Sequence, residues 1–187
     1  QMMEPAELPP MRPVRPAKDR PEWALTGAKG RKSQFISSIY VEPLEEEAFN
    51  LKLMEKYRLI EENEVRYKEI GQEDAEIAII AFGTAGRISQ SAMKMARDEG
   101  IKVGVFRPIS LYPFPYEQIK EIREKAKAVL VVEMSGGQML EDVKLGANGK
   151  VPIEFHGRMC GIVPTPEEIL DAIEEKLIGG SKRMKKN

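Results

Sequence analysis

The chain has 187 residues, of which 42% are hydrophobic and 32% charged, and its 30 acidic residues nearly balance 29 basic ones. This length suits one ordinary domain with an appendage, and the charge balance excludes a general attraction to nucleic acid or to a membrane surface. A single cysteine, Cys160, excludes an internal disulfide and any iron–sulfur cluster or structural zinc site built from this chain's thiolates alone.

Two further features of the composition bear on where the protein works. No apolar run approaches the roughly 20 residues that a membrane-spanning helix needs, and the single thiol suits a reducing compartment. We therefore expect a soluble, cytoplasmic protein. Dense use of Glu, Lys and Arg would also suit a thermophilic source.

Prolines concentrate at the start of the chain, where six of the 13 fall within the first 21 residues. Such a segment favours an extended backbone, so residues 1–42 are predicted to form an arm and loop that wrap on another surface. Residues 43 to about 70 then have the pattern of one long helix within a connecting segment, residues 43–73. Its apolar stripe, which must bury against something, consists of Phe49, Leu53, Tyr57, Ile60 and Tyr67.

An alternation of strands and helices fills residues 74–178. The apolar run at residues 77–82 is typical of a strand buried on both faces. A helix follows, with Thr84 as its predicted N-cap and Gly100 as its left-handed stop. Further strands are predicted at residues 101–106, 128–132 and 151–155.

The ends of the later helices carry specific signals. Pro115 opens the helix after the second strand, and Asn148 with Gly149 ends the helix after the third. Pro152 marks the fourth strand as an edge or entry strand. The last helix opens with a capping box of Thr165, Pro166 and Glu168. Residues 179–187 are predicted to form a basic, disordered tail.

This order of elements predicts an α/β fold, a three-layer αβα sandwich around a mainly parallel sheet with right-handed crossovers. The extended arm and the long helix would precede it. Sheets of this kind bind ligands at the carboxyl ends of their strands. The corresponding loops are residues 83–87, 107–114, 133–138 and 156–164.

The first of these loops offers a speculative anion site. Gly83, Thr84, Gly86 and Arg87 place backbone N–H groups and a cation at a helix N-terminus, where a phosphate or carboxylate could bind. The pattern is not a dinucleotide-binding fingerprint, and a glycine turn is also needed merely for tight packing of helix on strand. We favour the packing interpretation and keep the anion site as the alternative.

Three other residues could carry chemistry. Glu133 lies at a strand's carboxyl end, where it could act as an enzymatic acid or cap the following helix, and we favour the cap. His156 and Cys160 are four residues apart, but no nucleophile elbow or orienting partner accompanies them, so loop packing is the better interpretation. No Ser-His-Asp order, paired catalytic carboxylates or Walker motif occurs, and we expect no metal site and assign no catalytic residue.

Three stretches together resemble a known family: VGVFRPISLYPFPYEQI (residues 103–119), VVEMSGGQMLEDVKL (131–145) and FHGRMCGIVPTPEEIL (155–170). They are similar to the C-terminal part of the thiamine-dependent subunit of 2-oxoacid:ferredoxin oxidoreductases, a domain related to the C-terminal domain of transketolase. WALTGAKGR (23–31) and EKYRLIEENEVRYKE (55–69) also resemble that subunit, and the 2-oxoisovalerate type is the most similar. The resemblance runs from about residue 8 to residue 177.

The resemblance implies a multi-subunit enzyme that oxidatively decarboxylates a 2-oxoacid to an acyl-CoA and reduces ferredoxin. This chain would correspond to the part after the pyrimidine-binding domain and would be inactive alone. Thiamine diphosphate, Mg²⁺ and the iron–sulfur clusters would belong to the intact complex. The implied partners are the pyrimidine-binding domain and the other subunits, in an oligomer, with ferredoxin and CoA reached only indirectly.

Two other interpretations stay open. The chain could be a free-standing nucleotide- or anion-binding module that uses residues 83–87. It could also be a purely structural domain that holds subunits together.

Overall fold

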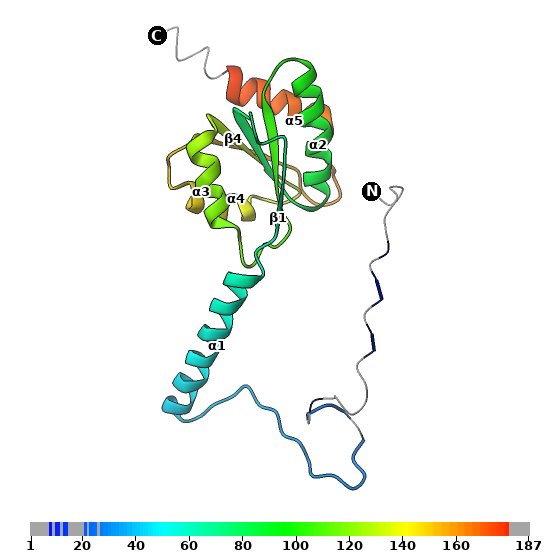
Figure 1. The fold of residues 1–187 in the computed structure, drawn as a ribbon, viewed down its shortest axis with the longest axis vertical. Helices are drawn as coiled ribbons and strands as arrows, with labels where there is room; N and C mark the ends of the chain where they lie inside the picture. Colours follow the sequence, from blue (N-terminus) through cyan, green and yellow to red (C-terminus); the bar gives the residue numbers. More distant parts are fainter. Residues whose placement is uncertain are drawn as a thin grey trace. The chain divides into compact units, whose positions relative to one another are not determined.

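The computed structural model describes residues 8, 10, 11, 13, 14, 21, 23–25 and 27–179. It divides the chain into two units, Gln1–Met54 and Glu55–Asn187, and Figure 1 traces both. The division falls inside helix α1, Pro43–Asn63. Part of the predicted arm, and the predicted tail after Gly179, lie outside the described residues. Among the described residues, no helix has the length and apolar content to cross a lipid bilayer.

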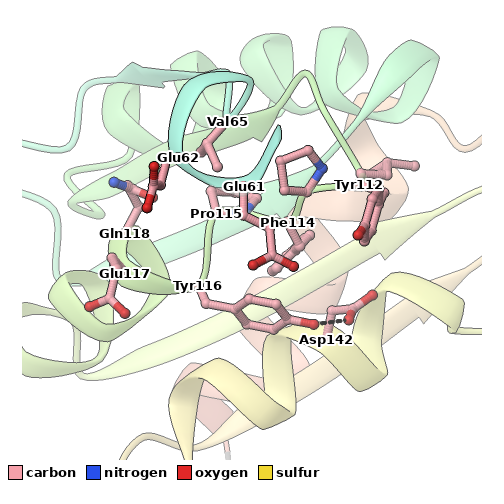
Figure 2. Close-up of a pocket in the computed structure, with 12 residues that line it drawn as sticks. Glu61, Glu62, Val65, Tyr112, Phe114, Pro115, Tyr116, Glu117, Gln118 and Asp142 are labelled. Carbon is pink, nitrogen blue, oxygen red and sulfur yellow. Dashed lines mark hydrogen bonds between the residues drawn. The ribbon is translucent and has the colours of Figure 1, made fainter. Parts of the chain in front are cut away.

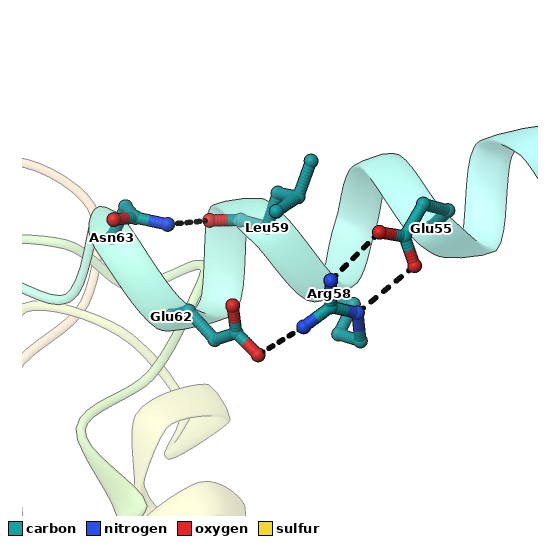
Figure 3. A network of polar contacts seen from close by, with 5 residues as sticks. All are labelled: Glu55, Arg58, Leu59, Glu62 and Asn63. Atoms are coloured by element: carbon teal, nitrogen blue, oxygen red, sulfur yellow. Dashed lines mark hydrogen bonds and ion pairs between the residues drawn. The ribbon is translucent and has the colours of Figure 1, made fainter.

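Helix α1 stands without a buried residue. Its second half is supported by charge pairs along its own surface (Figure 3): Arg58 contacts Glu55 at 2.7 Å and also pairs with Glu62. Pairs at these spacings stabilise an exposed helix by a few tenths of a kcal/mol, about 0.2–0.5 each. Of the predicted stripe, Phe49 is half-buried and its ring lies 4.8 Å from that of Tyr40.

The predicted extension of this helix to about residue 70 is wrong. The helix ends at Asn63, and Tyr67–Ile70 forms strand β1, which pairs antiparallel with β3, Val103–Pro108. Contacts remote in sequence decide this outcome. The Tyr67 ring stacks on Phe106 at 5.3 Å, and the Arg66 carbonyl accepts hydrogen bonds from the N–H groups of Ile109 and Ser110.

The sheet has five strands in the order β1-β3-β2-β4-β5. Strands β2 (Ile77–Ala81), β3, β4 (Ala128–Glu133) and β5 (Ile153–Gly157) run parallel. Every residue of β2 is buried, as its uninterrupted apolar run predicts. β5 lies at an edge, which confirms the prediction from Pro152.

Helices cover both faces of the sheet, which confirms the αβα sandwich (Figure 1). On one face lie α2 (Gly83–Asp98) and α5 (Pro166–Ala172), which continues as the π-helical turns of η2 (Ile173–Ile178). On the other lie α3 (Tyr116–Lys125) and α4 (Gln138–Ala147). Side chains of β2 alternate between the two cores, with Ile79 in the first and Ile80 in the second.

Most of the predicted helix ends are confirmed. Thr165 and Glu168 form both hydrogen bonds of the capping box at α5. Asn148 ends α4 with a left-handed backbone (φ 50°), and Gly100 follows α2 with φ 82°. The prediction of Thr84 as an N-cap is wrong. The N-cap is the extended residue Phe82, and the helix begins at Gly83, whose φ of 54° turns the chain directly into it.

Candidate functional site

The switch point of the sheet lies between β2 and β4. The connection after β2 leads to β3 on one side, and the connection after β4 leads to β5 on the other. A crevice forms where neighbouring connections diverge in this way, and it is the usual ligand site of such folds. Here it is a pocket of about 240 Å³, lined by Phe82, Gly83, Thr84, Ala85, Met134 and Ser135.

The four residues of the speculative anion site do not converge on this pocket. Gly83 and Thr84 line it, whereas Gly86 and Arg87 are not among its described lining residues. A Cβ atom at Gly86 would lie 2.7 Å from the carbonyl oxygen of Ala81. Gly86 therefore lets α2 pack closely on the end of β2, which is the packing interpretation. Arg87 is half-buried in the second turn of the helix.

Glu133 is fully buried next to the pocket. Both oxygens of its carboxylate accept hydrogen bonds. Oε2 accepts hydrogen bonds from Ser135 Oγ at 2.7 Å and from the Met139 N–H at 3.2 Å, while Oε1 accepts from the Leu140 N–H at 2.8 Å. The N-cap of α4, Gly137, has no side chain to do this. Glu133 thus caps the helix from the end of the preceding strand. The geometry supports the cap over an acid–base role.

A larger pocket, of about 730 Å³, lies at the end of α1 and the start of α3. The described residues that line it are Glu61, Glu62, Val65, Leu111, Tyr112, Pro113, Phe114, Pro115, Tyr116, Glu117, Gln118 and Asp142. Figure 2 shows the Tyr116 hydroxyl pointing at Asp142, to which it donates a hydrogen bond of 2.5 Å. That bond to the carboxylate, helped by partial burial, raises the pKa of Tyr116 to about 12.

Sequence reasoning missed this pocket because its walls come from three segments that are distant along the chain: residues 61–65, residues 111–118 and Asp142. The one local signal was the run Leu111–Tyr116 (LYPFPY), in which aromatic side chains alternate with proline. That run was identified only as a loop followed by a helix start.

His156 and Cys160 form no joint site. His156 is half-buried on β5, where burial lowers the pKa of its imidazole and the positive charge of Lys176 lowers it further. Cys160 is exposed, with φ 60°, on the loop that follows. No hydrogen bond joins the two side chains among the described residues. In the same part of the chain, no group of three His, Cys, Asp or Glu residues is placed to hold a metal ion.

Comparison with known proteins finds relatives that are subunits or domains of 2-oxoacid oxidoreductases and synthases. The family model of the pyruvate:ferredoxin oxidoreductase core domain II matches residues 75–169. Two ketoisovalerate oxidoreductase subunits VorB, from Methanothermobacter marburgensis and Methanothermobacter thermautotrophicus, are 44% and 41% identical over 177 residues. These alignments cover 94% of this chain and 49% of each relative. A 2-oxoglutarate synthase subunit KorA from M. marburgensis is 38% identical over 54% of this chain and 27% of the relative.

Solved structures support the fold. A 2-oxoglutarate:ferredoxin oxidoreductase from Magnetococcus marinus superposes with a TM-score of 0.62 at 24% identity, over 73% of this chain and 24% of that chain. A split-gene transketolase superposes with a TM-score of 0.51 at 22% identity, over 60% of this chain and 41% of that one. The transketolase-like fold expected from the sequence is confirmed.

The chain spans about half the length of the curated relatives it matches. Within that span, the match to core domain II covers all four parallel strands and the helices between them. This chain therefore belongs to the pyruvate:ferredoxin oxidoreductase core domain II family.

Proposed function

We propose that this chain is the core-domain-II part of a subunit of a branched-chain 2-oxoacid:ferredoxin oxidoreductase. The intact complex would oxidatively decarboxylate the 2-oxoacid to an acyl-CoA and reduce ferredoxin in the cytoplasm. The observation that carries the proposal is the extent of the VorB alignment, 94% of the chain against 54% for the 2-oxoglutarate subunit. At 177 residues it extends well beyond the 95 residues matched by core domain II, 75–169.

The work of this segment in the complex would be assembly and bracing of the active-site region. Helix α1 supports this role, because large apolar side chains remain exposed along it. Examples are Leu44, Leu51 and Met54, whose exposed fractions are 79%, 61% and 65%. Isolated exposed apolar residues are ordinary, but a helix with no buried residue and several such side chains favours an interface.

The residues of this chain do not fit the cofactors of such a complex. One cysteine and one histidine are too few ligands for an iron–sulfur cluster. The switch-point pocket is lined by no acidic residue among those described, and Glu133 behind it is engaged by three donors. We therefore assign thiamine diphosphate, Mg²⁺ and the clusters to other segments, and no catalytic step to this one.

The partners that follow are a pyrimidine-binding domain and the other subunits of the oxidoreductase. Ferredoxin and CoA would be contacted indirectly, through the assembled complex. No nucleic acid or membrane partner is proposed.

Co-expression tests this role. The chain is produced with the remaining segments and subunits of the complex, either unchanged or with Leu51→Ser and Met54→Ser. We expect the double variant to co-purify poorly and to lose 2-oxoisovalerate-dependent ferredoxin reduction. A matched pair on charged positions of the same helix, Lys52→Ser and Lys56→Ser, should behave as wild type. Full activity of a complex that lacks this chain would contradict the proposal.

The rival interpretation is an anion-binding module at Gly83, Thr84, Gly86 and Arg87, and the switch-point pocket is the observation in its favour. Calorimetry with nucleotides and thiamine diphosphate distinguishes the two. If the chain is an anion-binding module, the wild type should bind one of these ligands and the Arg87→Ala variant should lose that binding. If it is a part of the oxidoreductase subunit, neither protein should bind them.

A further inference from the structure

The large pocket beside α3 has an excess of negative charge. Four of its lining residues are acidic, and none of the described ones is Lys, Arg or His. Two of the four already pair with basic residues of their own helices, one on α1 and one on α3. The other two, Glu61 and Asp142, have no cationic partner among the described residues.

Three carboxylate oxygens of these two residues remain available for a ligand. Asp142 accepts the Tyr116 hydroxyl through Oδ1, and the described part of the chain provides no donor for its Oδ2. It provides none for either oxygen of Glu61. Carboxylate oxygens in this state at the wall of a pocket attract a cation that brings several hydrogen-bond donors.

A metal ion is not the cation that these residues suit. Ca²⁺ and Mg²⁺ require about six or more oxygen ligands around one point, and within the described ranges no group of three His, Cys, Asp or Glu residues is placed to hold a metal ion. An organic cation requires less, because one or two carboxylates and an aromatic face are enough to bind it.

Aromatic rings line the same pocket and indicate a cation independently of the acidic residues (Figure 2). Tyr112 is 63% exposed and meets Tyr57 edge-on with ring centroids 6.3 Å apart, and Phe114 meets Tyr116 edge-on at 5.1 Å. A guanidinium group is planar and weakly hydrated, so it stacks on such rings. Because it also carries five N–H donors, it matches three free oxygens better than an ammonium group does.

The charge and the rim of the pocket restrict the source of the guanidinium group. An acidic lining disfavours a ligand that carries a carboxylate of its own, whereas the backbone of a polypeptide is uncharged. Leu111 lines the pocket and is 44% exposed, and Tyr57, which meets Tyr112, is 45% exposed. The apolar neighbours of an arginine residue in a polypeptide would cover this rim, and tyrosine and arginine are the residue types enriched at the centres of protein interfaces.

We propose that this pocket binds the arginine side chain of a polypeptide segment whose flanking residues are apolar and uncharged. The guanidinium group donates to Glu61 and to Oδ2 of Asp142 and stacks on the Tyr112 ring, while the flanking residues cover Leu111. The inference goes beyond the proposed function, which gives this pocket no role. It rests only on residues within the unit Glu55–Asn187.

Titration of the full chain with short blocked peptides tests the proposal. The probes are acetyl-Leu-Arg-Leu-amide and the corresponding citrulline peptide, which has nearly the same shape but no charge. Backbone amide NMR shifts should move on addition of the arginine peptide chiefly at Tyr112, Phe114, Tyr116 and Asp142. The citrulline peptide should bind at least about tenfold more weakly, because it lacks the charge that the carboxylates attract.

Variants of the pocket identify the groups that bind. Glu61→Gln and Asp142→Asn keep the shape of each side chain and should each weaken binding of the arginine peptide by about three- to tenfold. Tyr112→Ala should weaken it by about threefold, whereas Tyr112→Phe keeps the ring and should bind normally.

A matched control removes one acidic charge outside the pocket. Glu121→Gln lies on α3, but Glu121 is not among the described lining residues. Its effect on binding should be less than about twofold, because salt screens charges at that range. Circular dichroism checks that each variant is folded.

Free arginine distinguishes the two sources of a guanidinium group. It should bind more weakly than the blocked peptide, because its carboxylate meets the acidic lining and it has no apolar neighbours. Tighter binding of free arginine than of the peptide would assign the pocket to a small molecule and overturn the proposal.

Other results would overturn it as well. These are no binding of the arginine peptide up to about 10 mM, equal binding of the citrulline or the corresponding lysine peptide, NMR shifts confined to another part of the fold, or equal losses in Glu61→Gln and Glu121→Gln. The readout is peptide binding by this chain alone, so it is independent of the co-purification and activity that test the proposed function.

Discussion

Replacing Glu133 by glutamine should destabilise the α/β unit although the two side chains have the same shape. Glutamine keeps one oxygen for the Leu140 N–H, but its NH₂ group would face the Met139 N–H, donor against donor. The Ser135 hydroxyl, which also donates to this oxygen, can rotate and accept from the NH₂ group instead, whereas the backbone N–H of Met139 cannot. The variant therefore loses one charge-assisted hydrogen bond, at about 1.5–3 kcal/mol, and the favourable interaction of a negative charge with the N-terminus of α4, at about 0.3–1 kcal/mol.

These losses are partly offset, because the variant no longer buries a charge. We expect the free energy of unfolding to fall by about 2–3 kcal/mol in Glu133→Gln, and by about 4 kcal/mol in Glu133→Ala, where three donors lose their acceptor. For a folded unit of roughly 125 residues, 2–3 kcal/mol corresponds to a fall in Tm of about 8–11 °C.

Urea unfolding at pH 7, followed by circular dichroism, measures the effect. Glu141→Gln is the matched control, because Glu141 lies exposed in the first turn of the same helix and should change stability by less than about 0.5 kcal/mol. If Glu133→Gln is as stable as wild type or more so, the cost of burying the charge exceeds the value of its hydrogen bonds. The capping argument would then be refuted.

Three further changes test other parts of the fold. Gly86→Ala would bring a Cβ atom to 2.7 Å from the Ala81 backbone oxygen, which cannot rotate away, so the free energy of unfolding should fall by about 2 kcal/mol or more in urea titrations. Thr165→Ala removes the capping-box acceptor for the Glu168 N–H and should cost about 1 kcal/mol by the same measurement. Burial lowers the pKa of His156, so below its ordinary value, near 6.5, the unfolded chain binds a proton that the folded chain does not. Stability should therefore decline as pH falls through that value, which thermal melts between pH 7.5 and 5 can follow.

Each of these has its own control. Gly136→Ala adds a Cβ atom whose nearest neighbour is 4.0 Å away, so equal damage there would reject the packing argument for Gly86. Thr165→Ser keeps the hydroxyl and should restore the cap, and a loss as large as in Thr165→Ala would exclude capping as the cause. For the imidazole, His156→Gln should show a shallower decline with pH, and an unchanged slope would assign the effect to other groups.

The parallel sheet could be predicted because its signals are local. The apolar run at residues 77–82 is too continuous for a half-buried strand, and glycine follows it directly. The capping box at Thr165 and the left-handed Asn148 are likewise properties of a few neighbouring residues. Such features depend little on contacts with residues distant in the sequence.

The end of α1 could not be predicted in this way. Ile60 and Tyr67 lie at helical spacing, so the pattern continues smoothly past Asn63. Strand β1 forms because the Tyr67 ring stacks on Phe106, about 40 residues away in sequence, and because the Ser110 hydroxyl accepts a hydrogen bond from the Arg66 N–H. The pocket at the start of α3 was missed for the same reason, since Glu61, Tyr116 and Asp142 come together in its lining only after the chain has folded.

The order of the strands has a consequence for how the protein is made. β2 is the first parallel strand to leave the ribosome, and it lies in the middle of the finished sheet. β3 and β4 can then pair with the two free edges of β2, and β5 can pair with β4. The sheet can therefore form from its centre outward, and no strand has to insert between two strands that are already paired. β1 is synthesised just before β2 but pairs with β3, so it has no partner until β3 has emerged.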